Sequence, residues 1–369
     1  MGLKYGLLAA ATAAMLSVPA LADEIPLGMV VATSGAFAGG EAPLINGVRM
    51  AVDDINEKGG IDGDMLVLSI EDTGSEQTGA INAFNRAVSY EPVAIMNTTL
   101  SGFNLSLMPI IEEEGIPTFT GGASVQLSPE KRGARNLFRV RTSDAAVPVA
   151  AAKFAIETLG AKSLGVVYIN NDYGIGWRDE ITAVAEAAGV ELAAESFEGA
   201  DRDLTPQIVS MRDAGADVVI SVGDPPNQVV FVQQAGQLGL DAEIIVSNAG
   251  VLPTTLTVYP EGAADGIYGT VDSLPAIDPA TAEWAERYTE RFGITADYSA
   301  AEYYDGVMML AGAIAEVGTD PEDIVDHLRE IDGYEGIGNT YSYVEGGDGG
   351  TGVVLGKVEG TKLTLAAEE

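Results

Sequence analysis

The sequence predicts an α/β protein with two Rossmann-like lobes, each built on a parallel sheet, joined by a hinge that the chain crosses several times. Short apolar, strand-like runs alternate with amphipathic helical segments, and this alternation is typical of a parallel sheet covered by helices. The same pattern starts again after Ser143, which indicates a second unit of the same kind. The tail departs from it, with consecutive helices followed by short strands. A tail that completes both lobes makes the chain cross between them more than once, and such crossings form a hinge.

The first residues indicate export. A basic residue, Lys4, precedes a short run of apolar and small residues, and Ala20 with Ala22 supplies the small-x-small pattern that a signal peptidase cleaves. The apolar run is too short to cross a bilayer whose hydrocarbon core is ~30 Å thick. We therefore expect residues 1–22 to be a cleaved signal peptide and the mature protein to begin at Asp23 in the periplasm.

The first unit opens with an apolar run at 25–32, a glycine-rich turn and an amphipathic helix. Gly59-Gly60 ends that helix, as glycines commonly do. The positions that carry its helical period are Leu44, Val48, Ala51, Val52 and Ile55. The predicted elements that follow are a strand at 66–70, a helix at 77–89, a strand at 93–96, a helix at 105–114 and a strand at 116–119.

The spacing of apolar residues also predicts the helices and strands of the second unit and the tail. The second unit is predicted to hold a helix at 147–159, a strand at 164–169, a helix at 176–188, a strand at 190–197, a helix at 204–213, a strand at 218–222, a helix at 227–238 and a strand at 244–246. The tail is predicted to hold helices at 283–292, 300–317 and 321–331, then strands at 340–344, 353–358 and 363–366.

Composition excludes several classes of partner. Acidic residues number 55 against 19 basic ones, giving a formal net charge of −36, and such a charge repels nucleic acids and anionic lipids. The chain has no Cys, which excludes disulfides, thiolate metal sites and a lipid-anchored cysteine. We expect a monomer with no nucleic-acid partner and no insertion into the membrane. The acidity itself is explained by solubility and does not identify a ligand.

Catalytic signatures are absent from the sequence. The single histidine, His327, cannot build a catalytic triad or a metal cluster by itself. There is no Gly-x-Ser-x-Gly nucleophile elbow and no phosphate-binding loop, and Gly174-Ile175-Gly176 lacks the third glycine of a dinucleotide fingerprint. An α/β protein of this kind still offers strand ends and helix N-termini to a ligand. The sequence therefore predicts a binding protein without cofactor or metal, and not an enzyme.

Several motifs resemble one family along essentially the whole mature chain. They are Thr33-Ser34-Gly35, Asn46-Gly47, the stretch AVDDINEKGGIDG at 51–63, Glu112 to Pro117, Phe138-Arg139 with Asp144 just downstream, and Asn171-Asp172-Tyr173-Gly174. This pattern is similar to that of the periplasmic leucine/isoleucine/valine-binding proteins. These are the solute-binding components of ATP-driven (ABC) importers for branched-chain amino acids.

The resemblance implies a type I periplasmic binding fold with three hinge crossings. Lobe one would comprise residues 23–142 and 273–340, and lobe two residues 143–272 and 341–369. A small ligand, a branched-chain or hydrophobic amino acid or a related small carboxylate, would lie between the lobes. The partners implied are the permease and ATPase subunits of an ABC transporter.

The resemblance also implies where the ligand binds. Ser101 matches a serine that donates to the ligand carboxylate, and Gly122 and Ser124 match a segment that grips the head of the amino acid. Tyr173 matches an aromatic residue of the second lobe that closes over the ligand. Both serine segments follow predicted strands, where α/β sheets bind ligands, and hydroxyl and N–H donors hold an anion without a formal positive charge. Helix capping by Ser101 and a turn at Ser124 are the structural alternative.

Two departures from the family concern the ligand. The family places an acid for the ligand's ammonium on a second-lobe loop, and here that loop has Asn248 and Ala249. We expect either that Asp224, on a neighbouring loop, replaces the missing acid or that the ligand has no amine. The second departure concerns aromatic residues. One family aromatic position, after the strand at 218–222, falls in the segment Gly223-Asp224-Pro225-Pro226. Another, near the opening, is lost at Gly40, although Phe37 lies close by in the sequence.

Three alternatives to an amino-acid transport receptor stay open on the sequence. In the first alternative, the protein is a transport receptor whose ligand is an amine-free carboxylate, such as a 2-oxo or aromatic acid, or an amide. A ligand-sensing regulator of the same fold is a further alternative, and the cleavable signal disfavours it when that regulator is cytoplasmic. An enzyme is disfavoured because the nucleophile, histidine cluster and metal ligands are missing.

Overall fold

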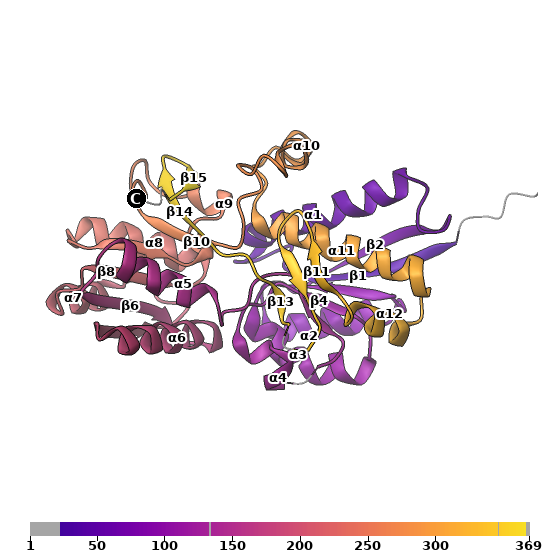
Figure 1. The fold of residues 1–369 in the computed structure, drawn as a ribbon, viewed down its shortest axis with the longest axis horizontal. Helices are drawn as coiled ribbons and strands as arrows, with labels where there is room; N and C mark the ends of the chain where they lie inside the picture. Colours follow the sequence, from indigo (N-terminus) through magenta and orange to yellow (C-terminus); the bar gives the residue numbers. More distant parts are fainter. Residues whose placement is uncertain (1–22, 133, 346, 367–369) are drawn as a thin grey trace, which may run out of the picture.

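The computed structural model describes residues 23–132, 134–345 and 347–366, and the predicted signal peptide at 1–22 lies outside the described residues. Figure 1 shows two groups of elements side by side, each arranged around its own β-sheet. One sheet has five strands and the other has seven. Among the helices of the described ranges, none combines the length and the apolar character needed to cross a membrane.

The five-stranded sheet is parallel throughout, in the order β2-β1-β3-β4-β5. Its strands are β1 (Glu24–Val31), β2 (Met65–Asp72), β3 (Ala94–Asn97), β4 (Thr118–Thr120) and β5 (Leu137–Arg139). In β1 the side chains of Leu27, Met29 and Val31 enter one hydrophobic cluster, and Val30 between them enters another. Because successive side chains of a strand point to opposite faces, both faces of this sheet are buried, as in other parallel sheets.

Helices from two distant parts of the chain cover this sheet. The N-terminal part contributes α1 (Ala38–Glu57), α2 (Gln77–Val88), α3 (Ser101–Glu114) and α4 (Pro129–Arg132), and the tail contributes α10 (Ala282–Phe292), α11 (Tyr298–Val317) and α12 (Pro321–Leu328). Helices α1 and α11 lie side by side (Figure 1). A Cβ atom at Gly47 of α1 would lie only 2.1 Å from the carbonyl oxygen of Ala300, so this close approach requires glycine there.

The seven-stranded sheet has the order β15-β14-β10-β9-β8-β6-β7. Its strands are β6 (Ser163–Ile169), β7 (Glu191–Phe197), β8 (Val218–Val222), β9 (Glu243–Val246), β10 (Tyr268–Val271), β14 (Val354–Glu359) and β15 (Lys362–Leu365). Strands β6 to β10 are parallel, and the hairpin of β14 and β15 joins antiparallel to β10. The helices of this unit are α5 (Val147–Lys153), α6 (Asp172–Ala188), α7 (Thr205–Asp213), α8 (Pro225–Gln237) and α9 (Pro253–Leu256).

The chain passes between the two sheets three times, after β5, after β10 and again before β14. Between the last two passages, α10 to α12 are followed by a small antiparallel sheet of β11 (Asp332–Glu335), β12 (Thr340–Ser342) and β13 (Gly349–Gly350). The boundary predicted at residue 340 falls inside this small sheet. Since β13 pairs with β12 and Gly350 also bridges to Thr142, the third passage follows Gly350.

The predicted α/β class with parallel sheets is confirmed. The strands predicted at 66–70, 93–96, 164–169 and 218–222 and the helices at 77–89 and 300–317 match observed elements to within a few residues. The helix predicted at 147–159 changes at residue 154 from α to π geometry, over Phe154–Thr158. Strands β5, β10, β11 and β13, which are two to four residues long, were not predicted; runs this short carry little alternation, and other strands of similar length were found because a neighbouring helix pattern delimits them.

Candidate ligand-binding site

A cavity of about 190 Å³ lies where the two sheets face each other. Segments that follow the carboxyl ends of β3, β4 and β5 line it from one side, and segments that follow β6, β8 and β9 line it from the other. This is the position at which open α/β sheets bind ligands. Five of the seven predicted site residues line the cavity, namely Phe37, Ser101, Tyr173, Asp224 and Asn248.

The remaining two predicted residues, Gly122 and Ser124, lie behind the cavity wall. Ala123 between them lines the cavity, whereas the carbonyl of Gly122 accepts a hydrogen bond from Arg139 and the Ser124 hydroxyl accepts one from Gln126 N at 3.2 Å. The Ser124 N–H donates to Ser101 Oγ at 3.1 Å. Ser124 therefore orients Ser101, and the ligand contacts expected of Gly122 and Ser124 stay predictions.

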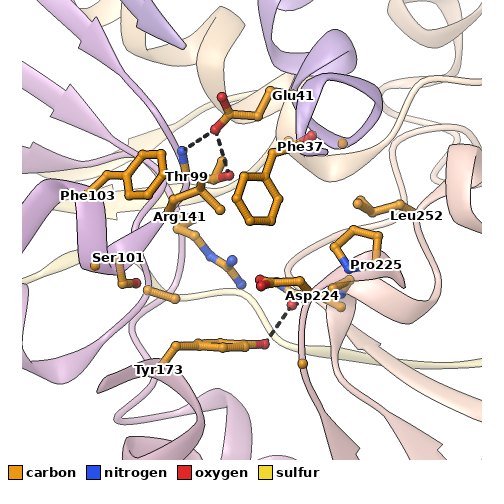
Figure 2. Close-up of a pocket in the computed structure, with 18 of the residues that line it drawn as sticks. Phe37, Glu41, Thr99, Ser101, Phe103, Arg141, Tyr173, Asp224, Pro225 and Leu252 are labelled. Atoms are coloured by element: carbon orange, nitrogen blue, oxygen red, sulfur yellow. Dashed lines mark hydrogen bonds between the residues drawn. The ribbon is translucent and has the colours of Figure 1, made fainter. Parts of the chain in front are cut away.

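Aromatic rings form an apolar wall on the first-sheet side. The rings of Phe37 and Phe103 meet edge to face with their centroids 6.2 Å apart, a favourable arrangement for two aromatic side chains. The Phe37 N–H donates to Ser75 Oγ at 3.0 Å, which holds this residue just before α1. Leu252, from the second-sheet side, lies across the cavity from them (Figure 2).

Glu41 on α1 is a buried acid at the edge of the cavity, and its side chain is fully engaged. It accepts hydrogen bonds from Ala32 N at 2.5 Å, from Thr99 N at 3.0 Å, from Thr99 Oγ1 at 3.2 Å and from the Thr98 hydroxyl. Burial raises the pKa of Glu41, and these donors oppose that effect. Glu41 thus ties α1 to the loops after β1 and β3 (Figure 2) and leaves little bonding capacity for a ligand.

Tyr173 forms the floor of the cavity in Figure 2. It lies in the first turn of α6, which Asn171 caps by accepting a hydrogen bond from Gly174 N at 3.0 Å. The phenol donates to Asn248 Oδ1 at 3.1 Å, and the ring packs edge to face on Trp177 with a centroid distance of 6.0 Å. Burial raises the pKa of Tyr173, so the phenol stays protonated. The two predicted site residues Tyr173 and Asn248 thus support each other.

Asp224 points its carboxylate into the cavity (Figure 2). It precedes α8, but its side chain makes no capping hydrogen bond. The local sequence explains this, because Pro225 and Pro226 have no N–H to offer and the N–H of Asn227 already donates to the Asp224 carbonyl at 2.9 Å. No described residue donates to the carboxylate, and burial raises its pKa to about 6.

The loop after β9 shows what surrounds that carboxylate. Ala249, where the sequence predicts that the family's acid is missing, lines the same cavity as Asp224. Gly40 also lines it, and a Cβ atom there would lie 3.7 Å from Pro225 Cγ. The positions of both departures, Ala249 and Gly40, therefore line the same cavity as Asp224, the one cavity carboxylate to which no described residue donates.

Arg141 is a cavity residue that the sequence analysis did not identify. Its side chain is 7% exposed, and its Nη2 donates to Asp272 Oδ1 at 3.0 Å. Burial lowers the pKa of Arg141, but Asp272 and further negative groups nearby outweigh burial and raise it well above its ordinary value. In Figure 2 the guanidinium points toward the carboxylate of Asp224. The two groups form no ion pair within 4.0 Å.

Other residues that line the cavity were also not predicted from the sequence. Arg141 follows β5, a three-residue strand that periodicity does not reveal. Tyr298 and Ser299 begin α11 and reach the cavity only because α11 packs beside α1. Thr99 had a usable signal, since it lies two residues before Ser101 in the same segment after a predicted strand.

The cavity combines apolar and polar side chains. Among the described residues, no group of three or more His, Asp or Glu side chains could hold a metal ion. The cavity offers an apolar wall, hydroxyl and amide groups, one guanidinium and one unpartnered carboxylate. This combination suits a small amphipathic molecule with polar groups at one end.

The chain is similar to known proteins along nearly its whole described length. Residues 24–362 match the family model described as "Periplasmic binding protein". The leucine-, isoleucine-, valine-, threonine-, and alanine-binding protein of Pseudomonas aeruginosa is 26% identical over 325 residues, which cover 87% of this chain and 86% of that protein. The leucine binding protein LivK from Thermotoga maritima is 26% identical with a TM-score of 0.85, over 93% of this chain and 98% of that chain.

A second solved structure shows the same fold at lower identity. It is the branched-chain amino acid transporter substrate binding protein LivJ from Streptococcus pneumoniae in complex with isoleucine, 21% identical with a TM-score of 0.85, over 93% of this chain and 99% of that chain. The predicted type I periplasmic binding fold and the predicted resemblance to leucine/isoleucine/valine-binding proteins are therefore confirmed. Because the family model spans nearly all of the described chain, this protein belongs to the periplasmic binding protein family.

Proposed function

We propose that this protein is the substrate-binding component of an ABC importer in the periplasm and that its ligand is a branched-chain or other hydrophobic amino acid. The observation that carries the proposal is the cavity between the two sheets, where an apolar wall faces a carboxylate and several hydrogen-bond donors. At about 190 Å³ it is smaller than the roughly 300–1,000 Å³ of sites for drug-sized ligands. Its size suits one amino acid.

Asp224 is the proposed partner of the ligand's ammonium group. A buried ammonium without a paired acid costs several kcal/mol, and Ala249 cannot supply that acid. Asp224 points into the same cavity and has no partner among the described residues. Ser101 is the proposed donor to the ligand carboxylate, and Tyr173 covers the ligand from the second-sheet side.

The two sheets define the proposed lobes. Residues 23–142 and 273–350 would form lobe one, and residues 143–272 and 351–366 would form lobe two, with the three passages of the chain as the hinge. Closure of the lobes on a ligand would present a surface to the permease, with the ATPase supplying energy on the other side of the membrane. A receptor of this kind binds and releases its ligand unchanged, so we propose no enzymatic activity.

Paired calorimetric titrations test the ligand. Leucine and 4-methyl-2-oxovalerate, which differ at the α substituent, are titrated into wild type and Asp224→Asn. We expect wild type to bind leucine more tightly than the oxo acid, and Asp224→Asn to lose most of its affinity for leucine. If leucine does not bind to wild type at all, the amino-acid proposal is refuted.

One observation favours a second candidate, a carboxylate without an amine such as a 2-oxo or aromatic acid. Burial raises the pKa of Asp224 to about 6, so a protonated Asp224 would donate a hydrogen bond to a neutral α substituent. Tighter binding of the oxo acid than of leucine, with little effect of Asp224→Asn, would support this candidate over the first.

A further inference from the structure

Arg141 lies where the cavity meets the hinge. It lies two residues after the end of β5, on the first passage of the chain between the sheets, and it lines the cavity. Its Nη2 donates to Asp272, and its Nε is enclosed without an acceptor. Its Nη1 has no acceptor among the described residues and is not among the enclosed unpartnered atoms. The guanidinium therefore presents one free N–H-bearing nitrogen to the cavity, as its direction in Figure 2 indicates.

Asp272 fixes this arrangement from the second passage of the chain. Besides accepting from Arg141, it accepts from Thr142 N at 2.6 Å through its other oxygen. Thr142 Oγ1 donates in turn to the carbonyl of Gly352 at 2.6 Å, on the third passage. Asp272 is 1% exposed. One short chain of hydrogen bonds thus connects Arg141 to all three passages.

The ion pair also determines what Arg141 can contribute to binding. Asp272 offsets the charge of the guanidinium, so the pair as a unit is neutral. What the cavity receives is a charged N–H donor that Asp272 holds in position. Such donors bind carboxylates more strongly than neutral donors do, and a donor that is already held in place loses little entropy on binding.

We propose that Arg141 is a specificity-determining residue that binds the ligand's carboxylate through Nη1, and that Asp272 is its positioning residue and links this contact to the hinge. The proposal rests on the proposed function, since it assumes an amino acid in this cavity, and it deepens that function by assigning the carboxylate contact. Asp224 and Arg141 would then hold the two charged ends of one zwitterion.

The test compares leucine with leucinamide, which keeps the ammonium and the side chain and replaces the carboxylate by a neutral amide. Wild type is expected to prefer leucine. The quantity compared is the dissociation constant of leucinamide divided by that of leucine. In Arg141→Gln this ratio should fall by about tenfold or more, since losing a charged contact to a buried carboxylate weakens leucine binding by at least that factor. Affinity for leucinamide should change much less. Asp272→Asn should lower the same ratio by a smaller factor, because Arg141 keeps its charge but loses its support.

Arg329→Gln is the matched control. Arg329 is a half-buried arginine that donates to the carbonyls of Arg135 and Leu137, does not line the cavity, and should leave the ratio unchanged. If Arg141→Gln does not fold because Asp272 is left unpaired, the double variant Arg141→Gln with Asp272→Asn removes both charges and gives the same comparison. An unchanged ratio in folded Arg141 variants refutes this inference alone. A wild type that binds neither compound overturns the proposed function and this inference together.

Discussion

Replacing Asp224 by Asn should stabilise the unliganded protein at neutral pH even though it weakens binding of an amino acid. Burial raises the pKa of Asp224 from an ordinary 3.8 to about 6. This shift of roughly two units corresponds to about 3 kcal/mol at 1.36 kcal/mol per unit. The Asp224 carboxyl group therefore stays protonated to a higher pH in the folded state than in the unfolded state. Wild type therefore loses this amount of stability as the pH rises from about 4 to 6, and asparagine does not titrate.

The assay is thermal unfolding of both unliganded proteins at a series of pH values from 4 to 8. The midpoint of Asp224→Asn should exceed that of wild type above pH 6, and the difference should shrink toward pH 4. Asp144 and Asp305, whose pKa values burial raises to about 6 and about 7, titrate in both proteins and cancel in the difference. Asp213→Asn, at an exposed carboxylate, controls for loss of a surface charge and should change stability by less than about 0.5 kcal/mol. A pH-independent difference, or a less stable Asp224→Asn at pH 7.5, would refute the reasoning.

Four further predictions concern binding. Below pH 6 the affinity of wild type for leucine should fall by up to tenfold per pH unit, because pairing with the ammonium group requires an ionised Asp224. A calorimetric affinity that does not change with pH would contradict this pairing. Ser101→Ala should weaken leucine binding by about 1–3 kcal/mol, and Ser124→Ala by less, because only Ser101 lines the cavity; equal losses in calorimetry would argue against this placement. Tyr173→Ala should weaken binding more than Tyr173→Phe, since apolar cover matters more than the phenol; the reverse order would make the hydrogen bond to Asn248 dominant. Solution scattering should show a smaller radius of gyration with saturating leucine, and an unchanged value would speak against lobe closure.

The elements of this fold follow from short-range patterns in the sequence. Apolar residues at helical spacing in α1 and the alternation of strands and helices predicted most elements, because each pattern reports burial of one face of one element. The same patterns placed Ser101 after a strand and Tyr173 near the start of a helix, where ligands bind in such folds. The absence of a capping hydrogen bond at Asp224 also has a local cause, since Pro225 and Pro226 have no N–H to donate, whereas the direction of its side chain depends on the fold.

Only the tertiary structure decided which of these groups share one cavity. Arg141 follows a three-residue strand whose pairing with β4 depends on the whole sheet, and its partner Asp272 lies far along the chain at the end of β10. Tyr298 reaches the cavity through the packing of α11 on α1, which the glycine at position 47 permits. The spacing of apolar residues shows which face of a helix or strand is buried. It does not show which distant residue packs against that face. The sequence by itself thus determined the kind of fold and the strand ends where a ligand would bind, whereas long-range packing brought a guanidinium and a carboxylate to face each other.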